Sequence, residues 1–522
     1  MRGRRFAVVF VPGLAERVFP QKQRPDPLLL DDLRAALNAS GKSAPRLGLP
    51  DRHDLNGQEK LLLRLAVGAA TERVHFSYPR LEVSKARPRV PSFYALDVER
   101  ARTGRIPDFP EVERRASRQA EARLAWPAPP DPDRAIDDAE HDLAVLGGLL
   151  APERPAQEVV GRARYLFSLN PGLRRTLAAR WARWKRAWSS QDGLCDIDDD
   201  TRSMLAAHRL TARPYSPSAL QHFAACPYKF LLASVHRLRP RDEIEPPLEH
   251  LDPLTRGSLF HQVQAEFVRT LERRAELPLT RARIPAAETV IDEVLDRVAA
   301  DYAERLAPAI ARVWRDEIEG MRSDLKGWVR HVANEDGEWI PMHAELGFGL
   351  QPGDGRDPES VPEPVEVDGR WLLRGVVDLV EARAAPTAHG ELRVTDHKTG
   401  RNRTREGMVV GGGETLQPVL YGLAVEQTVG RPVHESRLSF CTTVGRYEQR
   451  AVTLDDNARR RGAEVLEIID RAIEIGSLPP APRRGACQWC DFRVVCGPWE
   501  ERRAAVKDQA PLADLAALRR LP

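Results

Sequence analysis

Residues 371–380 read WLLRGVVDLV and residues 392–400 read LRVTDHKTG, and these two stretches decide the fold of the C-terminal half. Each is apolar until an acidic residue, Asp378 or Asp396, stands at or near its end. Short runs rich in valine and leucine are typical of buried β-strands. We therefore expect two adjacent strands that bring the two carboxylates close together.

Carboxylates on adjacent strands suit a hard cation such as Mg²⁺ or Mn²⁺, which prefers oxygen ligands. Lys398 follows Asp396 by two residues, so on a strand both side chains point to the same face. An ammonium group there can assist an attacking water. An Asp-x-Lys pair alone is far more often an ordinary surface pair. The Gly375-x-x-Asp378 strand before it and the turn at Gly400 after it favour a site.

At these residues the sequence resembles the PD-(D/E)xK nuclease superfamily. The resemblance is closer to the nuclease domain of the AddB and RecB helicase-nucleases and the related Cas4 proteins. It implies an α+β restriction-endonuclease-like core with flanking helices and a Mg²⁺- or Mn²⁺-dependent deoxyribonuclease. The expected activity is exonuclease action on single-stranded DNA ends in double-strand-break repair and recombination. A non-catalytic iron–sulfur subunit that binds DNA or serves as a scaffold is the alternative.

The resemblance also implies a set of metal ligands. The segment Gly257-Ser-Leu-Phe-His261 resembles the family's Gly-x-x-x-His segment, whose histidine binds the metal. His261 would then join Asp378 and Asp396, with the backbone carbonyl of His397 as a further ligand. Glu345, on an earlier strand, is expected only as an outer acid. The alternative for His261 is a polar helix histidine with no ligand role.

A second carried-over segment is Gln417-Pro-Val-Leu-Tyr421, which resembles the family's Gln-x-x-x-Tyr helix. That helix lines the active site and contacts DNA, so Gln417 and Tyr421 are expected to position the strand. The alternative is a surface amide and a core aromatic. Arg374 and the arginines of residues 401–405 are expected to contact phosphates, which would make binding weaken steeply as salt rises.

Four of the six cysteines follow a metal-binding layout, with one before the catalytic strands and three close together after them: Cys226, Cys487, Cys490 and Cys496. Four thiolates suit zinc or an iron–sulfur cluster equally well on spacing alone. The family resemblance implies a 4Fe–4S cluster that acts as a structural staple. Cys195 and Cys441 lie outside the pattern and are expected to be ordinary core residues.

The composition is that of a globular protein with 42% hydrophobic and 30% charged residues, and a chain of 522 residues predicts two or three domains. No apolar run approaches the roughly 20 residues of a membrane-spanning helix. The N-terminal apolar stretch is too short for a signal peptide, and the cysteines are sparse, so the cytoplasm is the expected location. The net charge of +3 decides nothing about a nucleic-acid partner.

Proline-rich stretches and changes of hydrophobic period predict four parts. Residues 1–110 are expected to be α/β, with strands at 6–11 and 74–78 and helices at 31–39 and 58–71. Residues 111–212 form a linker and a helical segment, beginning with the prolines between 107 and 132. Residues 213–500 are the nuclease domain, in which Ser216 caps a helix and Asp368-Gly369 turns a hairpin. Residues 501–522 are a tail.

Residues 7–14 and 59–78 resemble the late motor strand and the final motif of AddB-type superfamily 1 helicases. The arginine that senses the nucleotide in that motif is replaced by residues 68–70, which read Gly-Ala-Ala. Gly41-Lys42-Ser43 lacks the earlier glycine of a phosphate loop and follows a predicted helix. The resemblance therefore implies a helicase-like remnant that has no ATP site, with an AddA-like motor subunit as a possible partner.

Overall fold

The computed structural model describes residues 4–16, 18–20, 29, 31–40, 48–82, 87–108, 110–112, 114–115, 128–150, 156–195, 197–239, 251–306, 308, 311–335, 337–351, 353, 355–383, 390–497 and 499–522. The chain divides into two compact units, Met1–Ala182 with Arg493–Pro498, and Arg183–Phe492 with Trp499–Pro522. No helix in the described part combines the length and apolarity that crossing a bilayer requires.

The N-terminal part of the first unit is α/β, as predicted. β1 (Phe6–Val11) and β2 (Ala70–Phe76) pair in parallel, and α1 (Asp31–Ala39) and α2 (Arg52–Gly68) lie between them in the chain. β3 (Leu81–Glu82), β4 (Arg87–Pro88) and α3 (Phe93–Thr103) follow. The Gly41-Lys42-Ser43 stretch lies outside the described residues.

The helix α2 begins six residues earlier than the hydrophobic period predicts. The Asp51 side chain accepts a hydrogen bond from the backbone N–H of Asp54 at 2.8 Å, and the Asp54 side chain accepts one from the N–H of Asp51 at 3.2 Å. This reciprocal capping box satisfies two backbone donors that would otherwise lack partners. The polar cap, rather than the first apolar residue, therefore sets the start of the helix.

The helical segment contains α5 (Asp138–Leu149), α6 (Ala156–Leu169) and α7 (Pro171–Ala182). The last two are separated at Asn170, whose side-chain oxygen accepts a hydrogen bond from the Leu173 N–H at 2.9 Å. Pro171 then takes the first helical position, where its missing N–H costs nothing. Most of the proline-rich linker, residues 116–127, lies outside the described residues.

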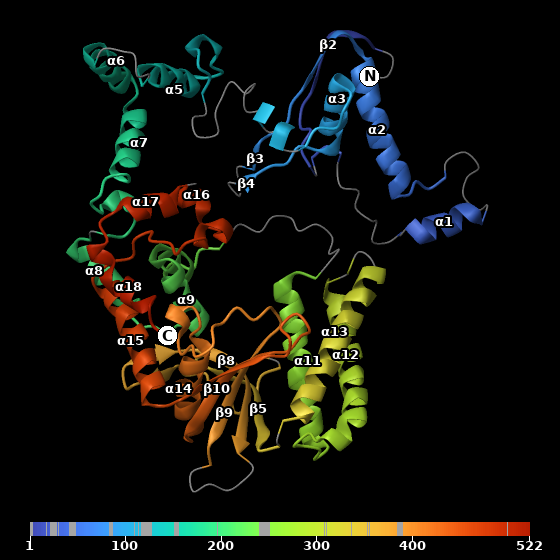
Figure 1. Ribbon diagram of the computed structural model, residues 1–522, viewed down its shortest axis with the longest axis vertical. Coiled ribbons are helices and arrows are strands. Elements are labelled where there is room, and N and C mark those ends of the chain that lie inside the picture. The colour runs from blue at the N-terminus through green and yellow to red at the C-terminus, as the bar shows by residue number, and fades with distance from the viewer. Residues whose placement is uncertain are drawn as a thin grey trace. The chain divides into compact units, whose positions relative to one another are not determined.

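The second unit is built on a mixed five-stranded sheet in the order β11-β10-β9-β8-β5 (Figure 1). Its strands are β5 (Trp339–Phe348), β8 (Gly375–Arg383), β9 (Leu392–Lys398), β10 (Val433–Phe440) and β11 (Gln449–Thr453). β9 and β10 are parallel, and the other neighbours are antiparallel. The fold class predicted from the sequence is confirmed.

Helices cover both sides of this sheet (Figure 1). One core packs α14 (Gln417–Val429) and α15 (Asp456–Glu474) against it, and a second core packs α11 (Pro253–Arg273), α12 (Ile284–Leu306) and α13 (Ala311–Ala333). The unit also contains α8 (Asp199–Ala206) and α9 (Pro217–Ala225). Ser216 caps α9 as predicted, because its hydroxyl accepts a hydrogen bond from the Ala219 N–H at 3.2 Å.

A small hairpin precedes β8. β6 (Val365–Val367) and β7 (Trp371–Leu373) pair in antiparallel fashion, and Asp368 and Gly369 between them have φ values of +54° and +59°. Two consecutive left-handed residues are what a type I′ turn requires, and Asp-Gly is a preferred pair for it. The turn predicted at these residues is confirmed.

The last residues of the chain are docked on the second unit. α17 (Glu500–Val506) and α18 (Ala513–Leu518) follow one another, and Leu515 and Leu518 are buried in the main core. The backbone N–H groups of Val410 and Gly411 donate hydrogen bonds to the Pro522 carbonyl at 2.7 and 2.9 Å. Residues 513–522 are therefore part of the folded domain.

Candidate metal centre and its surroundings

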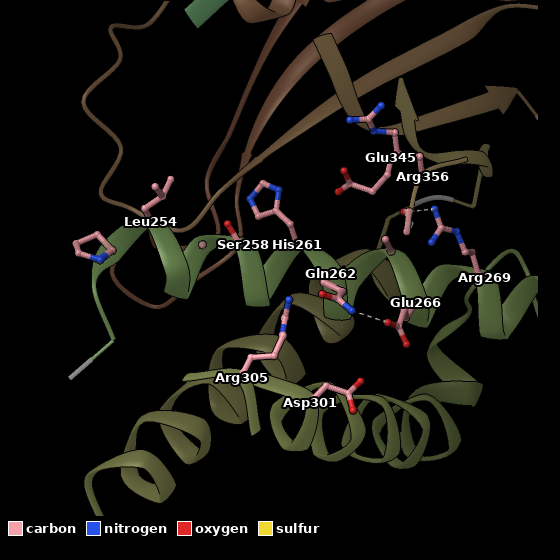
Figure 2. A pocket seen from close by; sticks show the side chains of 14 residues that line it. Leu254, Ser258, His261, Gln262, Glu266, Arg269, Asp301, Arg305, Glu345 and Arg356 are labelled. Atoms are coloured by element: carbon pink, nitrogen blue, oxygen red, sulfur yellow. Dashed lines mark hydrogen bonds between the residues drawn. The ribbon is translucent and has the colours of Figure 1, made fainter. Parts of the chain in front are cut away.

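Three potential metal ligands converge from three elements. His261 lies on α11, Glu345 on β5 and Asp378 on β8, and one ligand atom from each lies within 4.8 Å of the others. Nδ1 of His261 is 3.2 Å from Oδ1 of Asp378. Figure 2 shows His261 and Glu345 directed toward the same space beside α11. One nitrogen and two carboxylates at this spacing fit a divalent cation of the Mg²⁺ or Mn²⁺ type.

The strand register places the second acid beside this group. Leu379 pairs with Thr395, so the next residues along the antiparallel strands, Asp378 and Asp396, lie opposite each other on one face. Oδ2 of Asp378 accepts a hydrogen bond from the backbone N–H of His397 at 2.6 Å. Nζ of Lys398 is 2.5 Å from Oδ2 of Asp396. The two acids and the lysine identified from the sequence are therefore brought together.

Glu345 reaches the group through an unusual backbone conformation. Its φ is +59°, in the left-handed region that residues other than glycine seldom adopt. Such conformations cost of order 1–3 kcal/mol and persist where the surroundings hold them. Here the Glu345 carbonyl accepts a hydrogen bond from the Asp357 N–H at 3.0 Å. The sequence assigned Glu345 only an outer position, whereas the geometry gives its carboxylate the position of a ligand.

The site holds more negative charge than it can carry unaided. Burial raises the pKa of Glu345 to about 7, and the charge of Asp378 adds to the effect. Burial also raises the pKa of Asp396 to about 6, although Lys398 opposes that change. Buried acids whose pKa values rise in each other's presence gain stability from a cation between them. The electrostatics therefore agree with the ligand geometry.

The basic groups respond in opposite ways. Burial lowers the pKa of His261, but the neighbouring Asp378 carboxylate outweighs it and raises the pKa to about 9. Burial lowers the pKa of His397 to about 4, so its imidazole is neutral. Burial likewise lowers the pKa of Lys398, but Asp396 more than compensates and the net pKa is raised. Lys398 therefore stays a cation beside Asp396.

A cavity of about 810 Å³ opens beside the ligands (Figure 2). His261 and Glu345 line it, and so do Gly257 near the start of α11 and Arg305 near the end of α12. Gly257 has a local reason: a Cβ there would lie 3.8 Å from Oγ1 of Thr399, the residue after Lys398. The cavity thus reaches from the ligand group toward the chain that leaves β9.

Tyr421 lies against the catalytic strands, and Gln417 is held by another side chain. Burial raises the pKa of Tyr421 far above its usual range, and the charge of Asp396 adds to the effect, so the hydroxyl stays protonated. A Cβ at Gly375 would lie only 2.8 Å from Cε1 of Tyr421, which explains the glycine of the Gly-x-x-Asp stretch. The Gln417 side-chain oxygen accepts a hydrogen bond from Gln221 at 2.9 Å.

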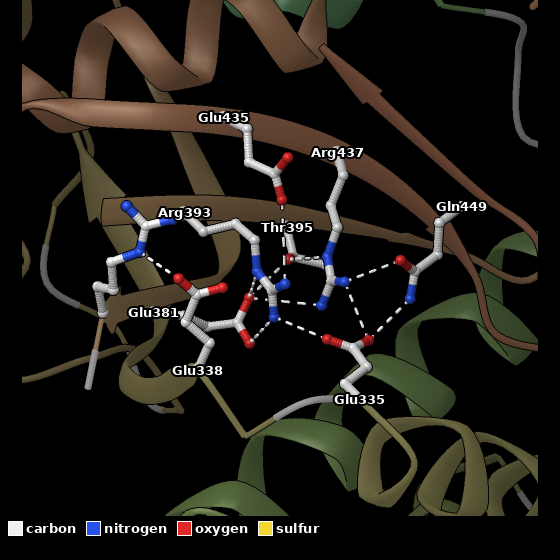
Figure 3. Close-up of polar contacts among 9 residues, drawn as sticks. Glu335, Glu338, Glu381, Arg393, Thr395, Glu435, Arg437 and Gln449 are labelled. Carbon is white, nitrogen blue, oxygen red and sulfur yellow. Dashed lines mark hydrogen bonds and ion pairs between the residues drawn. The ribbon is translucent and has the colours of Figure 1, made fainter. Parts of the chain in front are cut away.

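A buried ion network stands behind the acids on β8, β9 and β10 (Figure 3). Glu381 accepts hydrogen bonds from Arg393 at 2.7 and 2.8 Å and from Thr395 at 2.9 Å. Arg437 donates to Thr395 at 2.8 Å and to Glu335 at 2.9 Å. Glu381 is three residues from Asp378, and Thr395 adjoins Asp396. The network therefore fixes the register on which the metal centre depends.

The cysteines identified from the sequence are distributed over both units. In the second unit, burial raises the pKa of Cys487 to about 12, and Glu501 and the Cys226 and Cys490 thiols raise it further. The three thiols are therefore near enough to influence one another. Cys496 ends α16 (Arg493–Cys496), which belongs to the first unit. Its part in the four-cysteine layout stays a prediction.

The two remaining cysteines are separate from this group. Cys441 is 1% exposed in the core beside α11–α13, and Cys195 is half-buried. Arg374, expected to contact phosphate, donates its backbone N–H to the Tyr215 carbonyl at 3.1 Å. Its side chain is half-buried.

Comparison with known proteins identifies the same region. Residues 214–497 match the family described as the PD-(D/E)XK nuclease superfamily. An ATP-dependent helicase/deoxyribonuclease subunit from Symbiobacterium thermophilum is 27% identical over 427 residues, which cover 79% of this chain and 33% of that protein. The subunit of the same name from Carboxydothermus hydrogenoformans is 24% identical over 247 residues, covering 46% of this chain and 21% of the relative.

A shorter relative matches over nearly its whole length. The Gene 69 protein of Mycobacterium phage L5 is 23% identical over 305 residues, which cover 54% of this chain and 95% of that protein. By contrast, the chain spans a third or less of the two helicase/deoxyribonuclease subunits. The family match extends over more than half of the chain and includes every strand that carries the converging acids, so the chain belongs to the PD-(D/E)XK nuclease superfamily.

Proposed function

We propose that this protein is a Mg²⁺- or Mn²⁺-dependent deoxyribonuclease that acts as an exonuclease on single-stranded DNA ends during double-strand-break repair and recombination. The observation that carries the proposal is the group formed by His261, Glu345 and Asp378, with their ligand atoms within 4.8 Å of one another. The names of the two helicase/deoxyribonuclease relatives support DNA as the substrate.

The proposed roles follow from position and charge. His261, Glu345, Asp378 and Asp396 hold one or two divalent cations, with the backbone carbonyl of His397 as a further ligand. A cation bound there would supply Lewis-acid polarisation of a phosphodiester and lower the pKa of a water. Lys398, kept cationic by Asp396, orients the attacking water and offsets the negative charge that develops on the phosphate.

Residues around this centre would position the strand. Tyr421 remains protonated because of its burial, so its hydroxyl can donate a hydrogen bond but cannot act as a base. Gln417 begins α14 and shares its side-chain oxygen with Gln221. We assign both to strand positioning. The strand itself would enter through the cavity that His261 and Glu345 line.

We further propose that Cys226, Cys487, Cys490 and Cys496 hold a 4Fe–4S cluster, with zinc as the alternative. A reducing cytoplasm would keep these thiols available for ligation. Roughly 260 residues lie between Cys226 and Cys487, so a cross-link there removes much conformational freedom from the unfolded chain. The cluster would therefore act as a staple and take no part in the chemistry.

The relatives' names suggest that the chain works beside a helicase motor. We propose an AddA-like motor subunit as a partner, with residues 1–110 serving as a helicase-like remnant that does not hydrolyse ATP. The described α/β part supports only the architecture of such a remnant: two parallel strands with helices between them in the chain.

Purified protein, Mn²⁺ and single strands labelled at either the 5′ or the 3′ end test the proposal. The wild type should shorten the strands progressively, and Lys398→Ala should abolish cleavage while leaving DNA affinity nearly unchanged. Cleavage by Lys398→Ala at the wild-type rate would contradict the assigned role. Strand binding without cleavage by the wild type would instead favour the non-catalytic DNA-binding subunit.

A further inference from the structure

An arginine row follows the catalytic strand directly. Arg401, Arg403 and Arg405 are all exposed, whereas Asn402 and Thr404 between them are half-buried. None of the three arginines has a hydrogen-bond or ion-pair partner in the part of the chain that the structure describes. Many arginines elsewhere in the second unit are paired with acids. The three guanidinium groups of the row are therefore available to a negatively charged ligand.

The intervening residues hold the backbone of this loop in place. The Asn402 amide donates a hydrogen bond to Glu448 at 2.6 Å, and its oxygen accepts bonds from the N–H and hydroxyl of Thr404 at 2.9 and 2.6 Å. Glu448 also pairs with Arg450 at 2.9 Å. The even positions of residues 401–405 thus anchor the loop, which leaves the odd positions pointing to solvent.

The row starts at the mouth of the ligand cavity. Thr399 lies next to Gly257, which lines that cavity together with His261 and Glu345. The Thr399 carbonyl accepts a hydrogen bond from the Thr442 hydroxyl at 3.1 Å, so this end of the loop is fixed to the sheet. A ligand lying along the row would consequently lead into the metal centre.

We propose that Arg401, Arg403 and Arg405 form a phosphate-binding row that holds the backbone of a single DNA strand at the entrance to the metal centre. The proposal rests on the nuclease function proposed above and adds the residues that bind its substrate outside the site. Alternate residues of an extended segment are roughly 6.6 Å apart, so each guanidinium can meet a different phosphate of an unstacked strand. Arginine suits this task because its fork of donors matches phosphate oxygens.

The salt dependence of binding tests the row. Each phosphate contact on a single strand contributes about 0.7 to the slope of log affinity against log salt. The R401A/R403A/R405A variant should therefore bind a fluorescent single-stranded oligonucleotide, in Ca²⁺ without Mg²⁺ or Mn²⁺, with a slope smaller by about 2. The matched control is R273A/R281A/R283A, which removes three exposed arginines at and beyond the C-terminal end of α11. Its slope should equal that of the wild type.

The proposal is overturned if the triple variant keeps the wild-type slope, if the control variant loses as much, or if the wild type binds no single strand. Circular dichroism and Mn²⁺ titration of each variant check that the domain and its metal centre are intact. Cleavage is scored separately with Lys398→Ala. A wild type that binds through the row but cleaves nothing would count against the nuclease function and leave the phosphate contacts standing.

Discussion

Nδ1 of His261 lies 3.2 Å from Oδ1 of Asp378, although 117 residues separate the two in the chain. The contact joins the first helix of one core to a central strand of the sheet. Asp378 raises the pKa of His261 more than burial lowers it, so the pair is an ion pair at neutral pH. A divalent cation bound here would displace that proton, and metal binding should therefore release protons.

Glu345 should be required for metal affinity. Glu345→Gln removes one of the converging carboxylates while keeping the shape of the side chain, so the Kd for Mn²⁺ should rise at least about tenfold. Isothermal titration calorimetry measures this directly. Glu363→Gln, at an exposed position in the same unit, is the control and should bind Mn²⁺ as the wild type does. Equal affinity in both variants would remove Glu345 from the site.

Gly375→Ala should weaken both the fold and cleavage. The added methyl group would meet Tyr421 at 2.8 Å and Phe348 at 3.2 Å, and such overpacking costs about 1–3 kcal/mol. Adding Tyr421→Ala should relieve part of the cost, so the two changes should be non-additive in denaturant unfolding. Gly320→Ala, where a Cβ meets nothing within 4 Å, is the matched control. Strict additivity would mean that the two residues do not press on each other.

Glu381→Gln should destabilise the second unit strongly. Glu381 is 3% exposed and faces Arg393 and Arg437, so its loss leaves buried cations without a partner, at a cost of about 3–5 kcal/mol. Glu338→Gln breaks the more exposed pair with Arg383 and should cost at most about 1 kcal/mol. Denaturant unfolding compares the two variants. Similar small losses would show that the network contributes little.

The same network predicts a dependence on pH. Burial raises the pKa of Glu381, but Arg437 and Arg393 outweigh it and lower the pKa below its usual value. A lowered folded-state pKa stabilises the fold above the unfolded-state pKa of about 4.3, and this contribution is lost as pH falls through the folded-state value. The difference in unfolding free energy between the wild type and Glu381→Gln should thus shrink below about pH 4.3. A difference that stays constant down to about pH 3 would contradict this.

Loss of one cysteine should affect stability before chemistry. Cys490→Ala should lower the melting temperature and the bound metal content, because the staple across roughly 260 residues would be lost. Cys441→Ala, outside the layout, should keep the metal. Elemental analysis decides between the two proposed groups, since purified protein should be brown with iron and colourless with zinc. Unchanged stability and metal content in Cys490→Ala would exclude the staple.

Local sequence rules predicted the parts of the fold whose causes are local. Ser216-Pro217 starts a helix and Asp368-Gly369 turns a hairpin, because the cap and the turn depend on the residues that form them. Asp396 and Lys398 share a face because the period of a strand is two. The Asp378 strand could likewise be identified from its own apolar run.

The remaining features depend on contacts between distant residues. Glu345 becomes a potential ligand because β5 pairs with β8 and its own φ is +59°, and no local pattern encodes either fact. The docking of residues 513–522 depends on backbone N–H groups around Gly411 and on carbonyls that Arg519 reaches at Ala224 and Ala481, at 2.8 and 2.7 Å. A short charged segment gives no sign of such partners.

The most direct test of the metal centre is a crystal of the protein soaked in Mn²⁺, with anomalous diffraction recorded at the manganese edge. The peak should lie within about 2.0–2.6 Å of the ligand atoms of His261, Glu345 and Asp378, the range over which hard cations meet their ligands. Asp378→Ala should remove the peak. Manganese bound elsewhere, or a peak unchanged in Asp378→Ala, would contradict the proposal that these three residues hold the catalytic ion.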